Sequence, residues 1–420
     1  MARTRPQAEP PSRASVLVAA AGFLLAEIAV LPGAASPFRL PKEAAALAAI
    51  CLAVALALLG AARRRRIVVP GGRLAWVLAA LPALQLASAV WSADPLRALE
   101  SAVLSTLWVV AVLWFATLDD DRRGFIAAAA VLGVAASAAV MLLQLAGMEI
   151  FSFAAPFTSS RLSLTGLTGN PADLAMAAAL LLPFLLLWTE TSRRPRIAGA
   201  AAVFLSLAVL ITQTLTGIAA LAALLLVWLI RKRSPKLWLS VALIGALVVA
   251  AALTAGLGDR LQRDAKRALR GEWYELFSAR GDGWTAAAEM VRSRPAAGVG
   301  AANFTQLYYP SRLAWLERAG GTGGRSELAS HFEWAHCDPL QLASELGLAG
   351  ALWMAVFAWS LASSRERAGP LLPLAAAAAA PFLLLHYPAH LAIGLIPISL
   401  VLGHVVSRDA APRTFSWQRG

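Results

Sequence analysis

The densest group of side chains able to do chemistry lies in HFEWAHCDP, residues 331–339. His331, His336, Cys337 and Asp338 stand there directly before a long apolar run. Asp338 fits the N-cap of the helix expected there, and Pro339 fits its first turn. An imidazole titrates near neutral pH, so His336 could take a proton from a hydroxyl group, with His331 and Asp338 as candidates for contacting the substrate. It could also be an ordinary interfacial histidine, or a metal ligand together with its neighbours. The spacing matches no common zinc motif, so we expect neither a metal nor another cofactor.

Arginines upstream of this stretch form a second chemical group. Arg280 precedes a short stretch with helical spacing, and Arg292 follows it, before a Gly-Val-Gly turn at residues 298–300. Guanidinium groups hold phosphate and pyrophosphate through paired hydrogen bonds. Both arginines are therefore candidates for an anionic substrate, although arginines on solvated helix faces also bind lipid headgroups.

A basic helix is predicted in GDRLQRDAKRALRGEWYELF, which begins at Gly258. Its arginines recur at helical spacing, and its leucines and alanines fall largely on other faces. Such amphipathic helices lie on membrane surfaces, and the arginines are also candidates for substrate binding. These arginines are Arg260, Arg263, Arg267 and Arg270.

Two further connections carry polar groups. Arg161 precedes a Gly-rich turn that ends in Asn170–Pro171, a typical helix start. Arg161 is also one of few basic residues in the short connections expected outside, so we include it among the substrate-binding candidates. In the last outside connection His386 and His390 flank Tyr387–Pro388, and they could line the same cavity.

Membrane helices must position these residues. Of the 420 residues, 59% are hydrophobic and 15% are charged, against about 25% charged in an ordinary soluble domain. Apolar runs of about 17–23 residues recur, long enough to cross a hydrocarbon core of about 30 Å as helices. We therefore expect an all-α polytopic membrane protein with about 12 transmembrane helices and a large outer helical loop. The expected spans are 15–31, 43–60, 73–91, 101–118, 124–146, 171–189, 197–212, 215–231, 237–256, 339–362, 370–386 and 389–407.

The basic residues are unevenly distributed between the connections. If the N-terminus is cytoplasmic, the inside segments carry 22 of the 37 Lys and Arg residues, the short outside loops carry four, and the segment 257–338 carries 11. Positive charge favours the cytoplasmic side, so we expect both termini in the cytoplasm and the long segment outside. The net charge of +13 needs no nucleic-acid partner, because topology and anionic headgroups account for it.

The long segment divides the chain into three parts. We expect nine transmembrane helices with short loops in 1–256, an outer loop carrying the catalytic residues in 257–338, and three helices with a cytoplasmic tail in 339–420. A connection of about 80 residues is far longer than two helices require, and long loops are commonly functional.

Four pieces of the chain, in this order, resemble the O-antigen ligase and polymerase superfamily of bacterial inner-membrane glycosyltransferases. Ser88–Leu99 is similar to the family's stretch after its third helix. Arg161–Ala175 resembles its Arg…Gly…Gly-Asn-Pro element. Ala279–Phe304 resembles its Arg…Trp…Pro…Gly-x-Gly…Phe segment, and Ala335–Gly350 its His…Leu…Glu-x-Gly-x-x-Gly signature.

The resemblance implies transfer of a glycan from an undecaprenyl-pyrophosphate carrier to a hydroxyl of lipid A–core or a related acceptor. The reaction would be metal-independent and inverting, on the periplasmic face, with membrane lipids as further partners. By position, His336 would be the base or would orient the acceptor hydroxyl. Arg280 would bind the pyrophosphate and stabilise it as it leaves. A polymerase of the same superfamily is the nearest alternative, and a transporter or flippase is the second, although we find no internal repeat of the transporter type.

One position departs from the family pattern. After the seventh span the family usually has Ser-Arg-(Thr)-Gly, whose arginine is assigned to the pyrophosphate. Residues 212–217 read TQTLTG here, with Leu215 in the place of that arginine. Either another basic residue, such as Arg161 or one of the arginines between 260 and 270, replaces it, or the donor is held differently.

Overall fold

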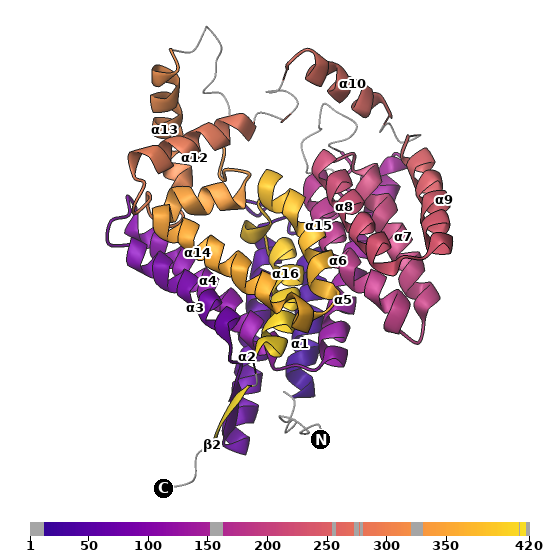
Figure 1. The fold of residues 1–420 in the computed structure, drawn as a ribbon, viewed down its shortest axis with the longest axis horizontal. Coiled ribbons are helices and arrows are strands. Elements are labelled where there is room, and N and C mark those ends of the chain that lie inside the picture. The colour runs from indigo at the N-terminus through magenta and orange to yellow at the C-terminus, as the bar shows by residue number, and fades with distance from the viewer. Residues whose placement is uncertain are drawn as a thin grey trace.

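The structure is a computed structural model that describes residues 12–151, 163–253, 258–272, 277, 280–320, 331–410 and 412–416. These residues form a helical body with a two-stranded ribbon (Figure 1). Its first helices are α1 (Arg13–Ile28), α2 (Leu40–Arg64), α3 (Arg73–Ser88), α4 (Pro95–Ala116), α5 (Asp120–Leu145), α6 (Pro171–Thr191), α7 (Pro195–Ile211), α8 (Leu215–Lys232) and α9 (Pro235–Ala252). The later elements are α10 (Gly258–Leu269), α12 (Arg280–Ser293), α13 (Phe304–Arg318), α14 (Asp338–Ala368), α15 (Leu371–Leu385), the short 3-10 helix η2 (Pro388–His390) and α16 (Ala392–Asp409); the strands are β1 (Arg66–Val69) and β2 (Arg413–Ser416).

Every span expected from hydropathy coincides with a helix of the described chain. Seven of these helices, α2, α4, α5, α6, α8, α14 and α16, are long and apolar enough to cross a membrane, and α3, α7 and α15 are shorter apolar helices. The all-α, multi-pass membrane fold is confirmed. The basic amphipathic segment is also helical, as α10.

Helix α6 forms the centre of the bundle. All of its residues from Leu174 to Leu186 are buried, and it packs against α5, α7, α8, α15 and α16. A helix that is apolar on every side is stable only when other helices surround it. Its start is fixed by Asn170, whose side chain accepts a hydrogen bond of 2.9 Å from the Ala172 backbone N–H. Pro171 fits the first turn because it lacks the N–H that would go unpaired there.

The start of α14 differs from the expected one. The sequence predicts Asp338 as the N-cap, but Cys337 stands at that position and Asp338 is the first helical residue. Its carboxylate accepts a 3.1 Å hydrogen bond from the backbone N–H of Ala389 instead. This hydrogen bond ties the last outer connection to the start of α14. The prediction of a local cap was wrong because the carboxylate accepts a hydrogen bond from a distant residue, Ala389.

Polar contacts gather the segments expected on the cytoplasmic side at one end of the bundle. The Asp409 carboxylate accepts hydrogen bonds from the Leu74 backbone N–H (3.2 Å) and from Arg367 (2.8 Å). Arg408 pairs with Asp120 at 2.9 Å. Strands β1 and β2 pair at this end, antiparallel, from Arg66 opposite Ser416 onward. The ribbon is a departure from the purely helical expectation.

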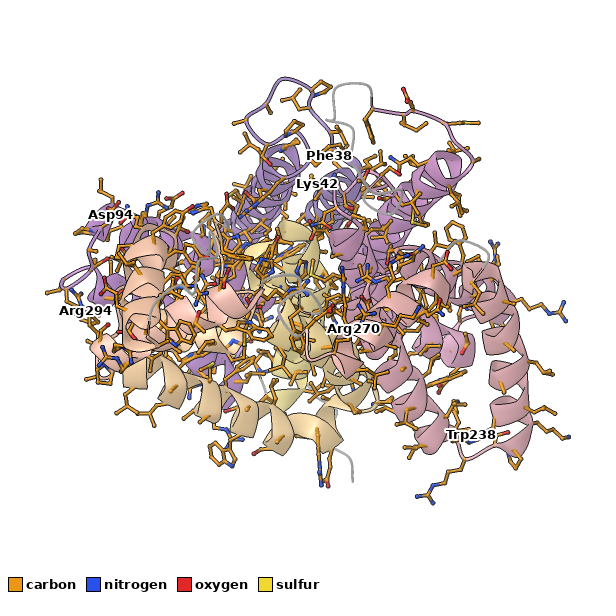
Figure 2. The ribbon with its side chains drawn as sticks, turned by 90° about the horizontal axis from the view of Figure 1, so that it is seen from above. Phe38, Lys42, Asp94, Trp238, Arg270 and Arg294 are labelled. Atoms are coloured by element: carbon orange, nitrogen blue, oxygen red, sulfur yellow. The ribbon has the colours of Figure 1, made fainter. Side chains whose placement is uncertain are left out.

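Helices α10, α12 and α13 lie at the opposite end (Figure 1). Seen from above that end, Asp94 and Arg294 lie at one side of the molecule and Trp238 at the other (Figure 2). Apolar side chains of α12 and α13 form a small core of their own with the turn between these helices and the segment before α14. That core comprises Ala286, Ala287, Met290, Val299, Phe304, Tyr308 and Ala335.

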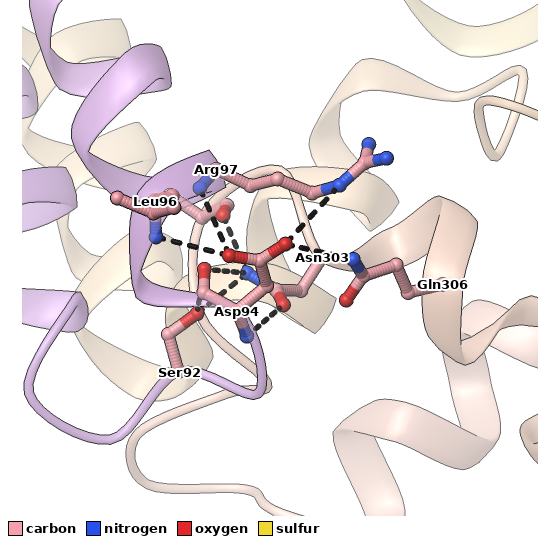
Figure 3. A network of polar contacts seen from close by, with 7 residues as sticks. Ser92, Asp94, Leu96, Arg97, Asn303 and Gln306 are labelled. Atoms are coloured by element: carbon pink, nitrogen blue, oxygen red, sulfur yellow. Dashed lines mark hydrogen bonds and ion pairs between the residues drawn. The ribbon is translucent and has the colours of Figure 1, made fainter.

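A polar network docks this outer segment on the connection between α3 and α4 (Figure 3). Asn303 is fully buried, donates to Ser92 Oγ at 2.6 Å and accepts from the Asp94 backbone N–H at 2.8 Å. Gln306 donates to the Asp94 carboxylate at 2.9 Å. The connection that resembles the family's stretch after its third helix therefore holds the outer segment in place.

Candidate active site

His336 lies in the chain that leads into α14 and has a strained backbone. Its φ is 54°, in the left-handed region that side-chain-bearing residues rarely adopt. Its ring meets Phe332 edge-on at 5.2 Å and Tyr387 at 4.8 Å between centroids. Its Nδ1 is buried without a hydrogen-bond partner in the described part of the chain. Strain together with an unpaired ring nitrogen is typical of a group held ready for a ligand.

The environment keeps this imidazole neutral. Burial, together with the nearby charges of Arg280 and His386, lowers the pKa of His336 to about 3. Desolvation and neighbouring positive charge both disfavour an imidazolium ion. At neutral pH the ring therefore retains a lone pair that can accept a hydrogen bond from a hydroxyl group.

Arg280 is the first residue of α12 and supplies a half-buried positive charge beside His336. Its Nε is buried without a partner among the residues the structure describes. Burial lowers the pKa of Arg280, Tyr387 opposes this shift, and Arg260 adds to it. A guanidinium group stays charged in a protein nonetheless. A half-buried charge of this kind suits an anionic ligand that enters from outside the chain.

A buried ion pair holds the helix that carries Arg280. Arg312 on α13 lies 2.7 Å from Asp282 in the first turn of α12, and both side chains are at most 6% exposed. Arg312 also donates to Thr285 Oγ1 at 2.8 Å. The start of α12 is thus fixed from α13, which limits the movement of Arg280.

Two glycine motifs interlock behind His336. The Gly298–Gly300 turn runs against a kink in α14 at Gly347, where φ is 59°. The Gly300 backbone N–H donates to the Glu345 carbonyl at 2.9 Å, and Leu348 donates to Pro295 at 2.9 Å. A Cβ at Gly298 would lie 2.3 Å from the Glu345 carbonyl oxygen. Only glycine permits this approach, which fixes the end of α12 against α14, the helix that His336 directly precedes.

The last outer connection brings a second histidine to the site. His386 is nearly fully buried, and its Nε2 lies 2.9 Å from Asp173 Oδ1 in the first turn of α6. Its ring centroid lies 6.1 Å from that of His336 and 4.3 Å from that of Tyr387. The Gly-Asn-Pro element at the start of α6 is therefore joined to His336 through His386.

An outer surface of aromatic and basic side chains continues from this point. Trp334 stacks on His390 with 4.1 Å between ring centroids, and the Arg39 guanidinium lies 5.3 Å from the Trp334 ring. Burial and the Arg39 charge lower the pKa of His390 to about 3. His390 also lies 3.5 Å from Asp338. Asp338 thus borders the site through His390.

The remaining sequence candidates lie in different surroundings. The His331 ring stacks on Tyr309 at 5.3 Å, at the edge of the small outer core. Arg292 binds Glu289 with an N–O distance of 2.7 Å, so its guanidinium is engaged within the protein. Arg161 lies outside the described residues.

The arginines of helix α10 differ in exposure. The Arg260 side chain is 14% exposed, and its Nε lies 3.2 Å from Asp264, which also lies 3.5 Å from Arg267. Arg263 and Arg270 are exposed. Of this set, Arg260 is the arginine whose charge lowers the pKa of Arg280.

Sequence reasoning did not single out Asp173, Tyr387 or Arg39 as site residues. The position of Asp173 after the Gly-Asn-Pro element could have indicated a role in the site. An aspartate in the first turn of a helix is also common because it interacts favourably with the helix dipole. Arg39 carried only the signal of a basic residue on the outer side. Within the described parts of the chain, no group of three or more His, Cys, Asp or Glu side chains could hold a metal ion.

The fold and these contacts define a multi-pass helical membrane protein with a polar site at one end of the bundle. A family model described as O-antigen ligase matches residues 200–355, which include Arg260, Arg280 and His336. This part of the chain is therefore similar to the O-antigen ligase family, in agreement with the resemblance seen in the sequence. No curated protein matches the chain.

Proposed function

We propose that this protein is an O-antigen ligase-type glycosyltransferase of the bacterial inner membrane. It moves a glycan from undecaprenyl-pyrophosphate to a hydroxyl of lipid A–core, or of a related acceptor, on the periplasmic face. The observation that carries the proposal is the adjacency of two half-buried side chains, His336 and Arg280, in the segment that matches the family. Residues 257–338 act as the catalytic periplasmic loop, residues 1–256 and 339–420 supply the membrane helices, and both termini are cytoplasmic.

The donor side of the reaction uses Arg280. The bond between the anomeric carbon and the pyrophosphate oxygen breaks, and negative charge builds up on the leaving pyrophosphate. A fixed guanidinium in a largely dry site stabilises that charge without having to reorganise during the step. The reaction then has no need of a divalent cation.

The acceptor side uses His336. The acceptor hydroxyl forms the new bond to the anomeric carbon from the face opposite the pyrophosphate, which inverts the configuration. Its proton passes to the imidazole as the bond forms and the hydroxyl becomes acidic. A pKa near 3 makes the ring a weak base toward a free alcohol, so its first role is to accept a hydrogen bond and orient the hydroxyl.

Arg260 supplies the guanidinium that the Leu215 position lacks. Two observations support this assignment: the Arg260 side chain is largely buried, and its charge lowers the pKa of Arg280. Two partly buried guanidinium groups near each other repel, and a pyrophosphate between them removes that cost. Asp264 neutralises Arg260 in part before the donor binds.

The test is a reconstituted transfer assay with an undecaprenyl-pyrophosphate glycan donor. His336→Ala is expected to lower the rate about 10²–10⁴-fold, and Arg280→Ala about 10²–10³-fold, since each removes a group that acts on the reacting atoms. Arg97→Ala is the matched control, because Arg97 is a half-exposed residue that pairs with Asp94 away from His336. EDTA should leave the rate of the wild-type protein unchanged.

The choice of acceptor separates the alternatives. Transfer to lipid A–core supports the ligase, whereas extension of a lipid-linked repeat unit alone would make the protein a polymerase. Full activity of His336→Ala would overturn the mechanism. Donor movement across the membrane without transfer would make the protein a flippase.

A further inference from the structure

A groove opens at the end of the bundle opposite the candidate active site. It has a volume of about 210 Å³ and runs between α2 and α4 toward strand β1. Strand β2 lies beside the end of α2, where β1 joins it (Figure 1). The side chains that line the groove are Val54, Ala57, Leu58, Ala61, Arg64, Arg66, Ile67, Val68, Val69, Pro70, Val110, Leu113, Trp114 and Thr117.

The two helices present apolar stripes to this groove. On α2 the lining residues from Val54 to Ala61 recur every three or four positions, which places them on one face. On α4 the residues from Val110 to Trp114 follow the same spacing. A lengthwise apolar channel between membrane helices matches the shape and polarity of an extended acyl chain.

The end of the groove near β1 is basic and contains an unpaired donor. Arg64 and Arg66 line this end. Trp114 is 7% exposed, and its indole Nε1 is buried without a hydrogen-bond partner among the residues the structure describes. A buried N–H of this kind favours an acceptor from beyond the residues the structure describes, such as a bound lipid. Arginine and indole donors beside an apolar channel fit a phosphate ester attached to an acyl chain.

We propose that the groove binds one phospholipid with an anionic headgroup. Its acyl chain lies between α2 and α4, its phosphate lies at Arg64 and Arg66, and an ester or phosphate oxygen accepts from the Trp114 indole. A free anion would leave the apolar stripes uncovered, and a neutral lipid would bring no negative charge to the basic end of the groove. This site is separate from His336, and its existence does not depend on the transferase activity.

Strand pairing gives the groove a fixed wall. Residues 66–69 of β1 line it, and β2 pairs with them over their whole length, from Arg66 opposite Ser416 to Val69 opposite Arg413. A two-stranded ribbon is marginally stable in water, so a lipid that packs against β1 would also stabilise the ribbon.

Binding is measured by native mass spectrometry of the purified full-length protein with phosphatidylglycerol or phosphatidylcholine of identical acyl chains. Wild type should bind one phosphatidylglycerol more tightly than phosphatidylcholine. Arg66→Ala should weaken phosphatidylglycerol binding about fivefold, the value of one basic residue at an anionic surface. Ala57→Phe should abolish it by filling the channel. Arg63→Ala is the matched control, because it removes the same charge from the same basic run outside the lining.

Four results would overturn the proposal. Equal weakening by Arg63→Ala and Arg66→Ala would indicate general surface attraction, and unchanged binding in Ala57→Phe would show that no acyl chain enters the groove. Full competition by inorganic phosphate would indicate an anion site without an acyl chain, and binding only after removal of residues 413–420 would make that segment the occupant. Trp114→Phe keeps the ring and removes the N–H, so weaker binding in this variant supports the assigned donor.

Discussion

The chemistry of His336 is set by the side chains around it. Burial, Arg280 and His386 keep its imidazole neutral, and Phe332 and Tyr387 fix the ring plane. A histidine in water has a pKa near 6.5 and would be partly protonated at mildly acidic pH. The site therefore gives His336 a constant state over a wide range of pH, which suits a residue that must accept a hydrogen bond.

A pH profile tests this environment. The neutral form of His336 persists well below neutral pH, so activity that requires it should stay constant from pH 8 to about 5 and fall as the pH approaches about 3. His386→Ala removes one of the groups that lower this pKa, so the pKa rises and the acidic limb of kcat/KM moves to higher pH. His404→Ala is the control, because His404 bonds Ala368 at the other end of the bundle. An unmoved limb in His386→Ala would contradict the assigned coupling.

At the scale of elements, the site depends on how α12 and α14 meet. The Gly298–Gly300 turn and the kink at Gly347 bond to each other through their backbones, and Asn303 anchors the same turn to the α3–α4 connection. Arg280 stands at the start of α12 and His336 just before α14. Any shift between these two helices therefore changes the distance between Arg280 and His336, the groups proposed to contact donor and acceptor.

Glycine substitutions test the interlock. Gly298→Ala and Gly347→Ala each place a Cβ at a positive φ and within 2.6 Å of a carbonyl oxygen, so each should lower the free energy of unfolding by about 1–3 kcal/mol. Transfer activity should fall as well. Gly281→Ala is the control, because no heavy atom lies within 4 Å of its added Cβ. Thermal unfolding in detergent compares the three variants, and equal midpoints would refute the role of the interlock.

At the scale of the whole molecule, the bundle separates two polar ends. One end carries the Asp409 and Asp120 ion pairs with the β1–β2 ribbon, and the other carries α10, α12, α13 and the candidate active site. From the distribution of basic residues we propose that the first end is cytoplasmic. A lipid-linked donor would then reach His336 from the outer leaflet while its isoprenoid tail stays in the bilayer.

Thiol labelling tests this orientation. Cys337 is half-buried beside His336, and Cys51 lies in the middle of α2. A membrane-impermeant maleimide should label Cys337 in intact spheroplasts and leave Cys51 unmodified, with Cys337→Ser as the control. Labelling should be slower than for a free thiol, because burial raises the pKa of Cys337 and lowers the thiolate fraction. Labelling of Cys337 only after permeabilisation would reverse the proposed topology.

The sequence by itself determined the membrane class, the positions of the helices and the resemblance to the O-antigen ligase superfamily. Hydropathy over about 20 residues and local motifs are properties of short stretches, so they need no tertiary contact to be read. It also pointed to His336 and Arg280 through motif positions. The N-cap prediction at Asp338 was wrong because local sequence rules do not include distant partners. The backbone N–H that donates to this carboxylate belongs to Ala389, 51 positions away.

Only the tertiary structure decided which polar groups meet. Asp173, His386 and His336 come from three separate segments, and nothing in their spacing reveals the 2.9 Å contact between the first two. Arg260 and Arg292 look alike in the sequence. In the structure the charge of Arg260 lowers the pKa of Arg280, whereas Arg292 is bound to Glu289. Burial and long-range contacts set the charge states and partners of these groups, and both arise only when the helices pack.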